Sequence, residues 1–186
     1  GQLIWGVGIA ADNQGNVYAT DGWLNRVTVF DKEGDYLRHW SAIEAGAGED
    51  EVNGIAGIAM DSSENLYITD GRSHKVRKFT KDGKFLSSWG SLGDGPDQLD
   101  SPWGITVDGD DFVYVADFGN DRVQVFDADG GFVTAVRGEA TLSTWAQEYL
   151  DSNVEEKDAR DRSDLEPDVH SLGIDSREES YHVEKY

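Results

Sequence analysis

Residues 21–40 read DGWLNRVTVFDKEGDYLRHW and gather residue types that could carry out acid–base chemistry. Asp21, Arg26 and His39 are side chains that transfer protons or stabilise charge when they surround a substrate. Two related stretches follow, DGRSHKVRKFTKDGKFLSSW from Asp70 and DFGNDRVQVFDADGGFVTAV from Asp117. Because an enzyme rarely needs the same acid three times, most of this stretch is predicted to be scaffold.

Other motifs of catalysis and metal binding are missing from the sequence. The four histidines show neither His-x-His nor His-Glu-x-x-His spacing, and no G-x-S-x-G elbow or phosphate-binding loop occurs. The runs at Asp108 (DGDD) and Asp127 (DADGG) contain only fragments of a calcium loop and lie where hairpin turns are expected. The sequence therefore favours a noncatalytic protein with no cofactor and no bound metal.

The composition narrows the range of partners. The 186 residues include 37 acidic and 16 basic side chains, a formal net charge of −21. This field repels phosphates and anionic lipids, so we expect neither nucleic acid nor a membrane surface as a partner. The chain has no cysteine, which leaves the redox compartment and the localisation unknown. Since the first residue is Gly1 and the only methionine is Met60, we expect an initiator and any signal peptide to lie outside this sequence.

A repeat organises the first three quarters of the chain. Gly8, Gly57 and Gly104 align with spacings of 49 and 47 residues, and their neighbours align without gaps over about thirty positions. Each unit contains four short β-rich runs separated by Gly, Asn and Asp, the first set near residues 8–11, 17–20, 27–30 and 36–40. Four antiparallel strands in a unit of this length are typical of a propeller blade.

The motifs G-I-x-x-D, N-x-Y-x-x-D, N/H-x-R/K-V-x-x-F and D-G-x-F/Y-x-x-x-W resemble the NHL repeat family. The resemblance implies an all-β fold, a β-propeller of NHL type with three four-stranded blades at residues 1–40, 41–89 and 90–138. Domains of this family are usually six-bladed, so three blades are half a ring. Either further blades are missing, or two copies close one ring through a two-fold rotation. We expect self-association, because open apolar faces favour it.

The residues that recur in all three units are predicted to be structural. The Asp residues that follow the first and second strands accept backbone amides in turns (Asp12, Asp61 and Asp108; Asp21, Asp70 and Asp117). Cations five residues after the second Asp are expected to pair with an acid between blades (Arg26, Lys75 and Arg122). Aromatic residues on the strands are expected to fill the space between blades (Tyr18, Tyr67, Tyr114, Phe30, Phe79 and Phe126).

Variable loops are the candidate functional site. Strand alternation places the loop after the second strand of each blade on the same face as the connector to the next blade. Aromatic anchors with polar neighbours suit a protein, a peptide or a carbohydrate. The predicted ligand-binding residues are Trp23, Arg72, His74, Trp103, Phe118 and Asn120, with Trp5 as a further aromatic. Alternatively, Trp103 closes the channel and Trp23 only covers its neighbour.

Two other functions stay open at this point. Asp21 to Asn25 resembles the corresponding stretch of peptidylglycine lyase propellers, which implies a catalytic tyrosine at the aromatic position and zinc-binding histidines before the first-strand Gly. This chain has Trp23 at the first position and Val7, Ala56 and Trp103 at the others, none of which serves that chemistry. A metal-dependent lyase or lactonase-like hydrolase could instead use acids, with Asp21, Asp70, Asp117 and Glu51 as ligands. In a third alternative, the segment only completes a ring whose function lies in other blades.

Residues 139–186 form an acidic tail with a different composition. Thr141 or Ser143 can cap a helix with an apolar stripe of Leu142, Trp145, Ala146, Tyr149 and Leu150. We predict a short helical segment here that acts as a lid or braces a blade, with a solvated charged segment as the alternative. No apolar run approaches the length needed to span a bilayer.

Overall fold

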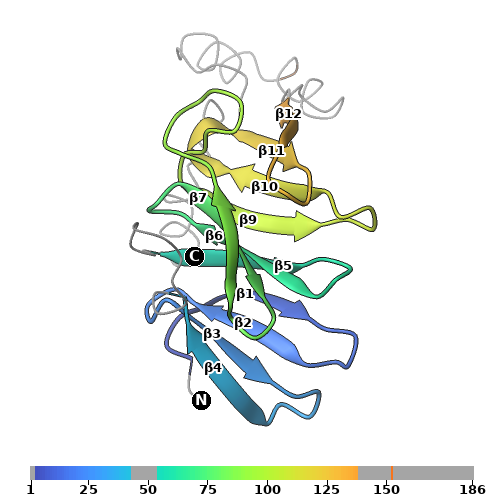
Figure 1. The fold of residues 1–186 in the computed structure, drawn as a ribbon. Coiled ribbons are helices and arrows are strands. Elements are labelled where there is room, and N and C mark those ends of the chain that lie inside the picture. Colours follow the sequence, from blue (N-terminus) through green and yellow to red (C-terminus); the bar gives the residue numbers. More distant parts are fainter. Residues whose placement is uncertain (1–2, 43–53, 138–151, 153–186) are drawn as a thin grey trace. The chain divides into compact units, whose positions relative to one another are not determined.

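The computed structural model describes residues 3–42 and 54–137 together with Ser152, and within these ranges the chain is all-β. Twelve strands form three four-stranded antiparallel sheets, which follow one another along the chain (Figure 1). Sheet 1 contains β1 (Gly6–Ala11), β2 (Val17–Asp21), β3 (Arg26–Phe30) and β4 (Tyr36–Ser41). Sheet 2 contains β5 (Ile55–Met60), β6 (Asn65–Asp70), β7 (Lys75–Thr80) and β8 (Phe85–Trp89). Sheet 3 contains β9 (Pro102–Val107), β10 (Val113–Asp117), β11 (Arg122–Phe126) and β12 (Phe132–Arg137), with the 3₁₀ turn η1 (Phe118–Asn120) between β10 and β11.

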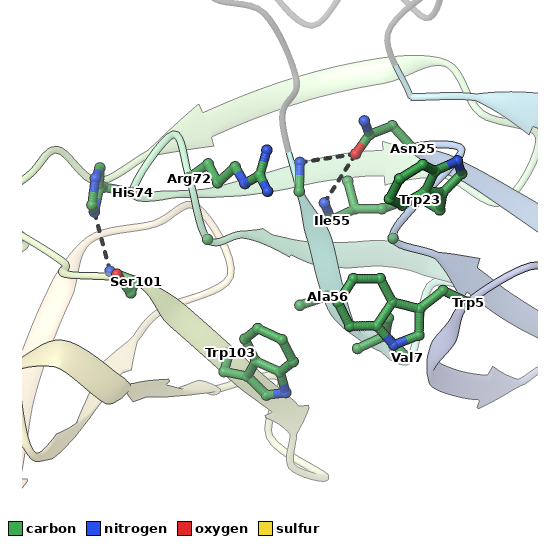
Figure 2. Close-up of a pocket in the computed structure, with 13 residues that line it drawn as sticks. Trp5, Val7, Trp23, Asn25, Ile55, Ala56, Arg72, His74, Ser101 and Trp103 are labelled. Carbon is green, nitrogen blue, oxygen red and sulfur yellow. Dashed lines mark hydrogen bonds between the residues drawn. The ribbon is translucent and has the colours of Figure 1, made fainter. Parts of the chain in front are cut away.

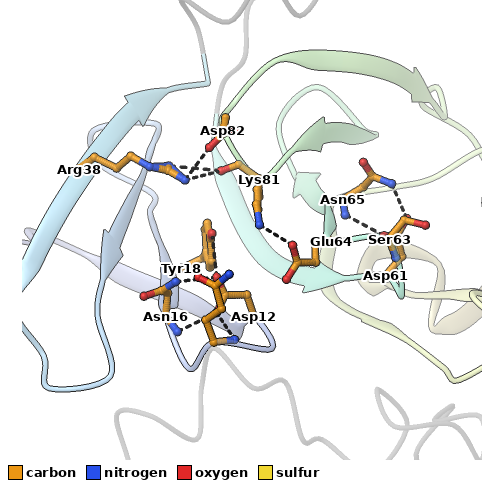
Figure 3. Close-up of polar contacts among 11 residues, drawn as sticks. Asp12, Asn16, Tyr18, Arg38, Asp61, Ser63, Glu64, Asn65, Lys81 and Asp82 are labelled. Carbon is orange, nitrogen blue, oxygen red and sulfur yellow. Dashed lines mark hydrogen bonds and ion pairs between the residues drawn. The ribbon is translucent and has the colours of Figure 1, made fainter.

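Each sheet is a meander in which neighbouring strands in sequence are neighbours in space. The sequence enforces this order through short turns that begin at an Asp. Asp12 Oδ1 accepts hydrogen bonds from the amides of Gln14 and Asn16, at 2.9 and 2.8 Å. Asp61 and Asp108 accept amides at the same two positions of their own turns. The predicted turn role of these three acids is confirmed, and Figure 3 shows the turns of Asp12 and Asp61.

The core lies between the sheets. Tyr18, Val27 and Val29 of sheet 1 are buried against residues of sheet 2 such as Leu66, Ile68 and Phe79. Tyr67 and Val76, which lie on the other face of sheet 2, are buried against Val113, Val115 and Phe126 of sheet 3. Sheet 2 is therefore covered on both faces by described residues, and sheets 1 and 3 each on one.

The predicted aromatic core is only partly confirmed for this reason. Tyr18, Tyr67, Phe79 and Phe126 are buried, as expected. Phe30 and Tyr114 are half-buried, because Phe30 lies on the first face of sheet 1 and Tyr114 on the last face of sheet 3. Alternation along a strand predicts the face that a side chain occupies, and the neighbour on that face decides its burial.

Hydrogen bonds from threonine hydroxyls to backbone carbonyls also join the inner strands of adjacent sheets. Thr20 Oγ1 donates to the carbonyl oxygen of Ala56, and Thr69 Oγ1 donates to that of Trp103, each at 2.6 Å. A Cβ placed on Gly57 would lie 2.6 Å from the Trp103 carbonyl oxygen. Since no other residue fits so close to the next strand, the approach of sheets 2 and 3 requires glycine at position 57.

The expected pairing of the recurring cations between blades is wrong for Arg122. Its Nε lies 2.7 Å from Asp117 Oδ2 within the same sheet, and its guanidinium donates to the carbonyls of Asp94, Gly95 and Gln98 in the preceding connector. A long, planar donor with five N–H groups can hold one carboxylate and several carbonyls at once. Arg122 thus fixes the connector to its own sheet.

Sheet 2 contains a buried ion pair that the repeat pattern did not predict. Arg77 Nε lies 3.0 Å from Asp70 Oδ2, and both side chains are buried. The equivalent positions hold Thr28 in sheet 1 and Gln124 in sheet 3, whose Nε2 donates to Asp117 Oδ2. The residue at this position of the repeat thus differs in each sheet.

The chain divides into two units, Gly1–Val136 and Arg137–Tyr186. The second unit, with the predicted helix and the tail, lies outside the described residues apart from Arg137 and Ser152. A search of the described residues finds no helix long and apolar enough to cross a membrane.

Candidate functional site

A cavity of about 680 Å³ opens where the loops after β2 and β6 meet the starts of β5 and β9 (Figure 2). Three indoles surround it: Trp5 comes just before β1, Trp23 from the β2–β3 loop, and Trp103 from β9. Apolar residues at the strand starts, Val7, Ile55 and Ala56, also line it. The cavity is built by all three sheets of the first unit.

The three tryptophans are unusually accessible for their size. Trp5, Trp23 and Trp103 are 55%, 69% and 52% exposed. Tryptophan is normally highly buried, and an exposed group of large apolar side chains usually marks a binding surface. The observation argues against the alternative in which Trp23 only covers its neighbour, since most of its ring faces solvent.

Polar side chains at the cavity link one sheet to the next. Asn25 Oδ1 accepts the amides of Gly54 and Ile55, at 2.8 and 3.2 Å. At the equivalent position of sheet 2, His74 Nδ1 accepts the amide of Ser101 at 3.1 Å. Both residues have a left-handed backbone, with φ of 46° and 55°, which asparagine tolerates well and histidine less often.

These bonds determine what the polar groups can offer a ligand. An imidazole that accepts at Nδ1 in its neutral form carries its proton on Nε2 and can donate from there. The Asn25 side chain retains the donors of its amide group in addition to the acceptor that it uses. Arg72 comes from the β6–β7 loop, and its aliphatic stem lies against Gly54.

Asp21 fixes the backbone of two of the three tryptophans, Trp5 and Trp23. Its Oδ1 accepts the amides of Trp23 and Leu24 at 3.1 Å and that of Trp5 at 3.4 Å, and its Oδ2 accepts the amide of Ile4 at 2.9 Å. Burial acts to raise the pKa of Asp21, but these amides stabilise the carboxylate and together lower the pKa below 3.8. Asp21 is therefore an ionised anchor for the loop that presents Trp23.

We expect the Asp21→Asn variant to be less stable than wild type at neutral pH, by about 1–3 kcal/mol, because one buried acceptor oxygen is replaced by a donor. A carboxyl whose folded-state pKa is lowered stabilises the fold in full above its ordinary pKa and loses that contribution as the pH falls through the lowered value. The difference in the free energy of unfolding between variant and wild type should therefore become smaller below about pH 3.8. Urea unfolding across this range measures it, with the exposed Asp35→Asn as control. A gap that stays constant with pH would contradict the role of the charge.

The structure brings together four of the six predicted ligand-binding residues, Trp23, Arg72, His74 and Trp103, which all line the cavity. Phe118 and Asn120 lie in η1 of sheet 3 and are not among its lining residues. Asn120 Nδ2 donates to the Gly93 carbonyl and to Asp117 Oδ2, at 2.8 and 2.9 Å, so it links the connector to the loop.

Two polar lining residues, Asn25 and Ser101, are not among the predicted ligand-binding residues. Asn25 occupies the N/H position of the repeat, and positions that recur in all three units are predicted to be structural. The equivalence of Asn25 and His74 in the alignment was the available signal, because both positions sit at the same point of the loop.

The acids considered for a metal-dependent enzyme are engaged elsewhere. Asp21 accepts four amides, Asp70 pairs with Arg77, and Asp117 accepts from Arg122, Asn120, Gln124 and the amide of Asp100. Glu51 lies outside the described residues. Among the side chains that the structure describes, no group of three His, Cys, Asp or Glu residues is placed to hold a metal ion.

Comparison with known families identifies an NHL repeat at residues 99–126. The chain thus contains an NHL repeat, and the recurring motifs of the other two units follow the same pattern. No curated protein matches the sequence at a significant level.

Solved structures share the fold of the three sheets, which resemble propeller blades. Virginiamycin B lyase from Staphylococcus aureus superposes with a TM-score of 0.56 and 18% identity over 74% of this chain and 42% of the lyase. Kuenenia stuttgartiensis hydrazine synthase gives a TM-score of 0.57 and 16% identity over 74% and 37%, and the nidogen/laminin complex gives 0.55 and 19% over 73% and 48%. The chain spans less than half the length of these structures. At such identities the likeness shows the fold alone.

Proposed function

We propose that the chain is a noncatalytic binding module that recognises a protein, a peptide or a carbohydrate through the cavity between Trp5, Trp23 and Trp103. The observation that carries this proposal is the grouping of three indoles, each more than half exposed, around one cavity. Three such rings, two from sheet 1 and one from sheet 3, are hard to explain by packing alone.

The chemistry of the lining supports a ligand with flat apolar faces and a few polar groups. Indole rings stack against sugar rings, prolines and aromatic side chains and lose little conformational entropy when they do so. Arg72, His74 and Asn25 lie beside the rings and can fix the orientation of the ligand through hydrogen bonds. Asn25 and His74 already accept backbone amides of the next sheet, and such contacts keep a binding site preorganised.

A sharp test compares Trp23→Ala with Leu86→Ala, which truncates an exposed apolar side chain on the outer strand β8. We expect the free energy of unfolding of both variants to lie within about 0.5 kcal/mol of the wild-type value, because both side chains lie at the surface. Wild type and Leu86→Ala should select the same ligands from a peptide library and a glycan array, whereas Trp23→Ala should bind them at least about tenfold more weakly. The proposal is wrong if neither collection yields a ligand of the wild type, or if Trp23→Ala binds its ligands as wild type does.

A further inference from the structure

The buried carboxylate of Asp21 lacks the cation that its counterparts in the other two sheets have. Arg77 Nε lies 3.0 Å from Asp70 Oδ2, and Arg122 Nε lies 2.7 Å from Asp117 Oδ2. All three aspartates are 0% exposed. In the described part of the chain, however, Asp21 accepts only backbone amides, four in number, and forms no ion pair.

Two substitutions within the repeat explain this difference. The position of Arg77 holds Thr28 in sheet 1, a short neutral side chain whose Oγ1 has no hydrogen-bond partner in the described part of the chain. Arg26 is the counterpart of Arg122, but its Nε does not donate to Asp21. Although burial acts to raise the pKa of Asp21, the amides lower it, so the carboxylate is ionised at neutral pH. Sheet 1 therefore holds a buried negative charge without a salt-bridge partner.

This charge lies directly behind two of the exposed indoles of the cavity. Asp21 Oδ1 accepts the backbone amides of Trp23 and Trp5, at 3.1 and 3.4 Å. The face of an indole ring carries negative potential and attracts the ammonium of Lys or the guanidinium of Arg. Within a protein, where the effective dielectric constant is well below that of water, a carboxylate acts over several ångströms. The rings and the carboxylate behind them thus attract the same kind of group, a cation.

The positive charge of the cavity lies at its other end. Figure 2 shows Trp5 and Trp23 on one side of Ile55, and Arg72 and His74 on the other side. A cation against the two indoles is therefore separated from the Arg72 guanidinium. At longer range, the formal net charge of −21 attracts a cationic ligand and speeds its association.

We propose that the cavity binds a basic segment of a protein or peptide, with a Lys or Arg side chain placed against Trp5 and Trp23. This inference rests on the proposed binding function of the cavity and narrows its ligand from a protein, a peptide or a carbohydrate to a cationic peptide segment. A neutral carbohydrate would gain little from the charge of Asp21, and an acidic peptide would be repelled by it. Charge complementarity of this kind contributes specificity as well as affinity.

The first test compares peptides that differ only in charge. From a library of short random peptides, we expect the full chain to select sequences that contain Lys or Arg. Citrulline in place of Arg and norleucine in place of Lys keep the apolar part of the side chain and remove the charge. We expect each exchange to weaken binding by at least about fivefold in isothermal titration calorimetry. Selected peptides that bind equally well after the exchange would overturn the inference.

The second test gives Asp21 the cation that its counterparts have. Thr28 does not line the cavity, and Thr28→Arg places the guanidinium of sheet 2 opposite Asp21, whereas the control Thr28→Gln places the neutral amide of sheet 3 there. Circular dichroism and thermal melts check that both variants fold. We expect Thr28→Arg to bind the cationic peptides at least about threefold more weakly than Thr28→Gln, and both to bind the citrulline peptides alike. Equal binding of the cationic peptides by the two folded variants would contradict the role of the Asp21 charge.

The outcomes separate this inference from the proposed function on which it rests. If the wild type selects neutral or acidic ligands and Trp23→Ala weakens their binding, the cavity is a binding site and only the cationic ligand is wrong. If neither peptides nor glycans bind the wild type, both proposals are wrong. Should Thr28→Arg fail to fold, the matched peptides still decide the matter, because they leave the protein unchanged.

Discussion

Replacement of Arg77 by methionine is expected to destabilise the protein by about 3–5 kcal/mol. Arg77 Nε and Asp70 Oδ2 are 3.0 Å apart, and the two side chains are only 1% and 0% exposed. Methionine fills much of the same space but removes the guanidinium, so that the buried carboxylate loses its facing cation. Removal of one partner costs more than the pair contributes, because the remaining charge is still desolvated.

The exposed ion pair of Arg38 and Asp82 is the matched comparison, since it also joins an arginine to an aspartate, at 2.9 Å. The Asp82 side chain is 75% exposed, so Asp82→Asn should cost less than about 1 kcal/mol. Urea unfolding of both variants at one pH measures the difference. Equal losses for Arg77→Met and Asp82→Asn would show that burial does not set the contribution of the inner pair.

The substitution Arg77→Gln tests whether a neutral hydrogen-bond donor can replace the buried cation. Gln124, its equivalent in sheet 3, donates to Asp117 Oδ2 at 3.1 Å and to the Gln98 carbonyl. Glutamine at position 77 could therefore offer Asp70 a neutral donor in place of a charge. We expect Arg77→Gln to be destabilised less than Arg77→Met, because an unsatisfied buried acceptor costs more than one that keeps a hydrogen bond.

The strands and turns could be predicted from the sequence because they depend on local chemistry. An Asp that opens a turn accepts the amides two and four residues later, and this geometry needs no distant partner. The gap-free repeat then transferred each assignment to the other two units. Burial was harder to predict, since Phe30 and Phe79 occupy the same position of the repeat and only Phe79 has a described sheet packed on its face.

The candidate site was predicted in part for a similar reason. Topology places the β2–β3 and β6–β7 loops on one face, and this suffices to bring Trp23, Arg72 and His74 to one cavity. Topology does not say how far each loop reaches. Asn120 points back to the connector at Gly93, and the partners of Arg122 are carbonyls that no sequence pattern indicates. Side-chain direction within irregular loops depends on contacts that appear only once the chain is folded.

Truncation of Trp40 to alanine should cost about 3 kcal/mol, because a large aromatic side chain is removed from a joint between two sheets. Trp40 packs against the core between sheets 1 and 2, with its ring 5.1 Å from that of Phe79 and in contact with Gly83. Its indole nitrogen has no hydrogen-bond partner among the described residues, so the contact there is one of shape and apolar area. Trp40→Phe should therefore retain most of the stability.

Val136→Ala, at the equivalent position of sheet 3, is the matched control for Trp40→Ala. Val136 is 58% exposed, and its truncation should change the free energy of unfolding by less than about 0.5 kcal/mol. Thermal and urea unfolding of the three variants would measure the contrast. A loss at Val136 as large as that at Trp40 would mean that the last face of sheet 3 is covered in solution. A small loss would leave Trp40 and Trp89 as the tryptophans that join two described sheets, through their contacts with Gly83 and Gly130.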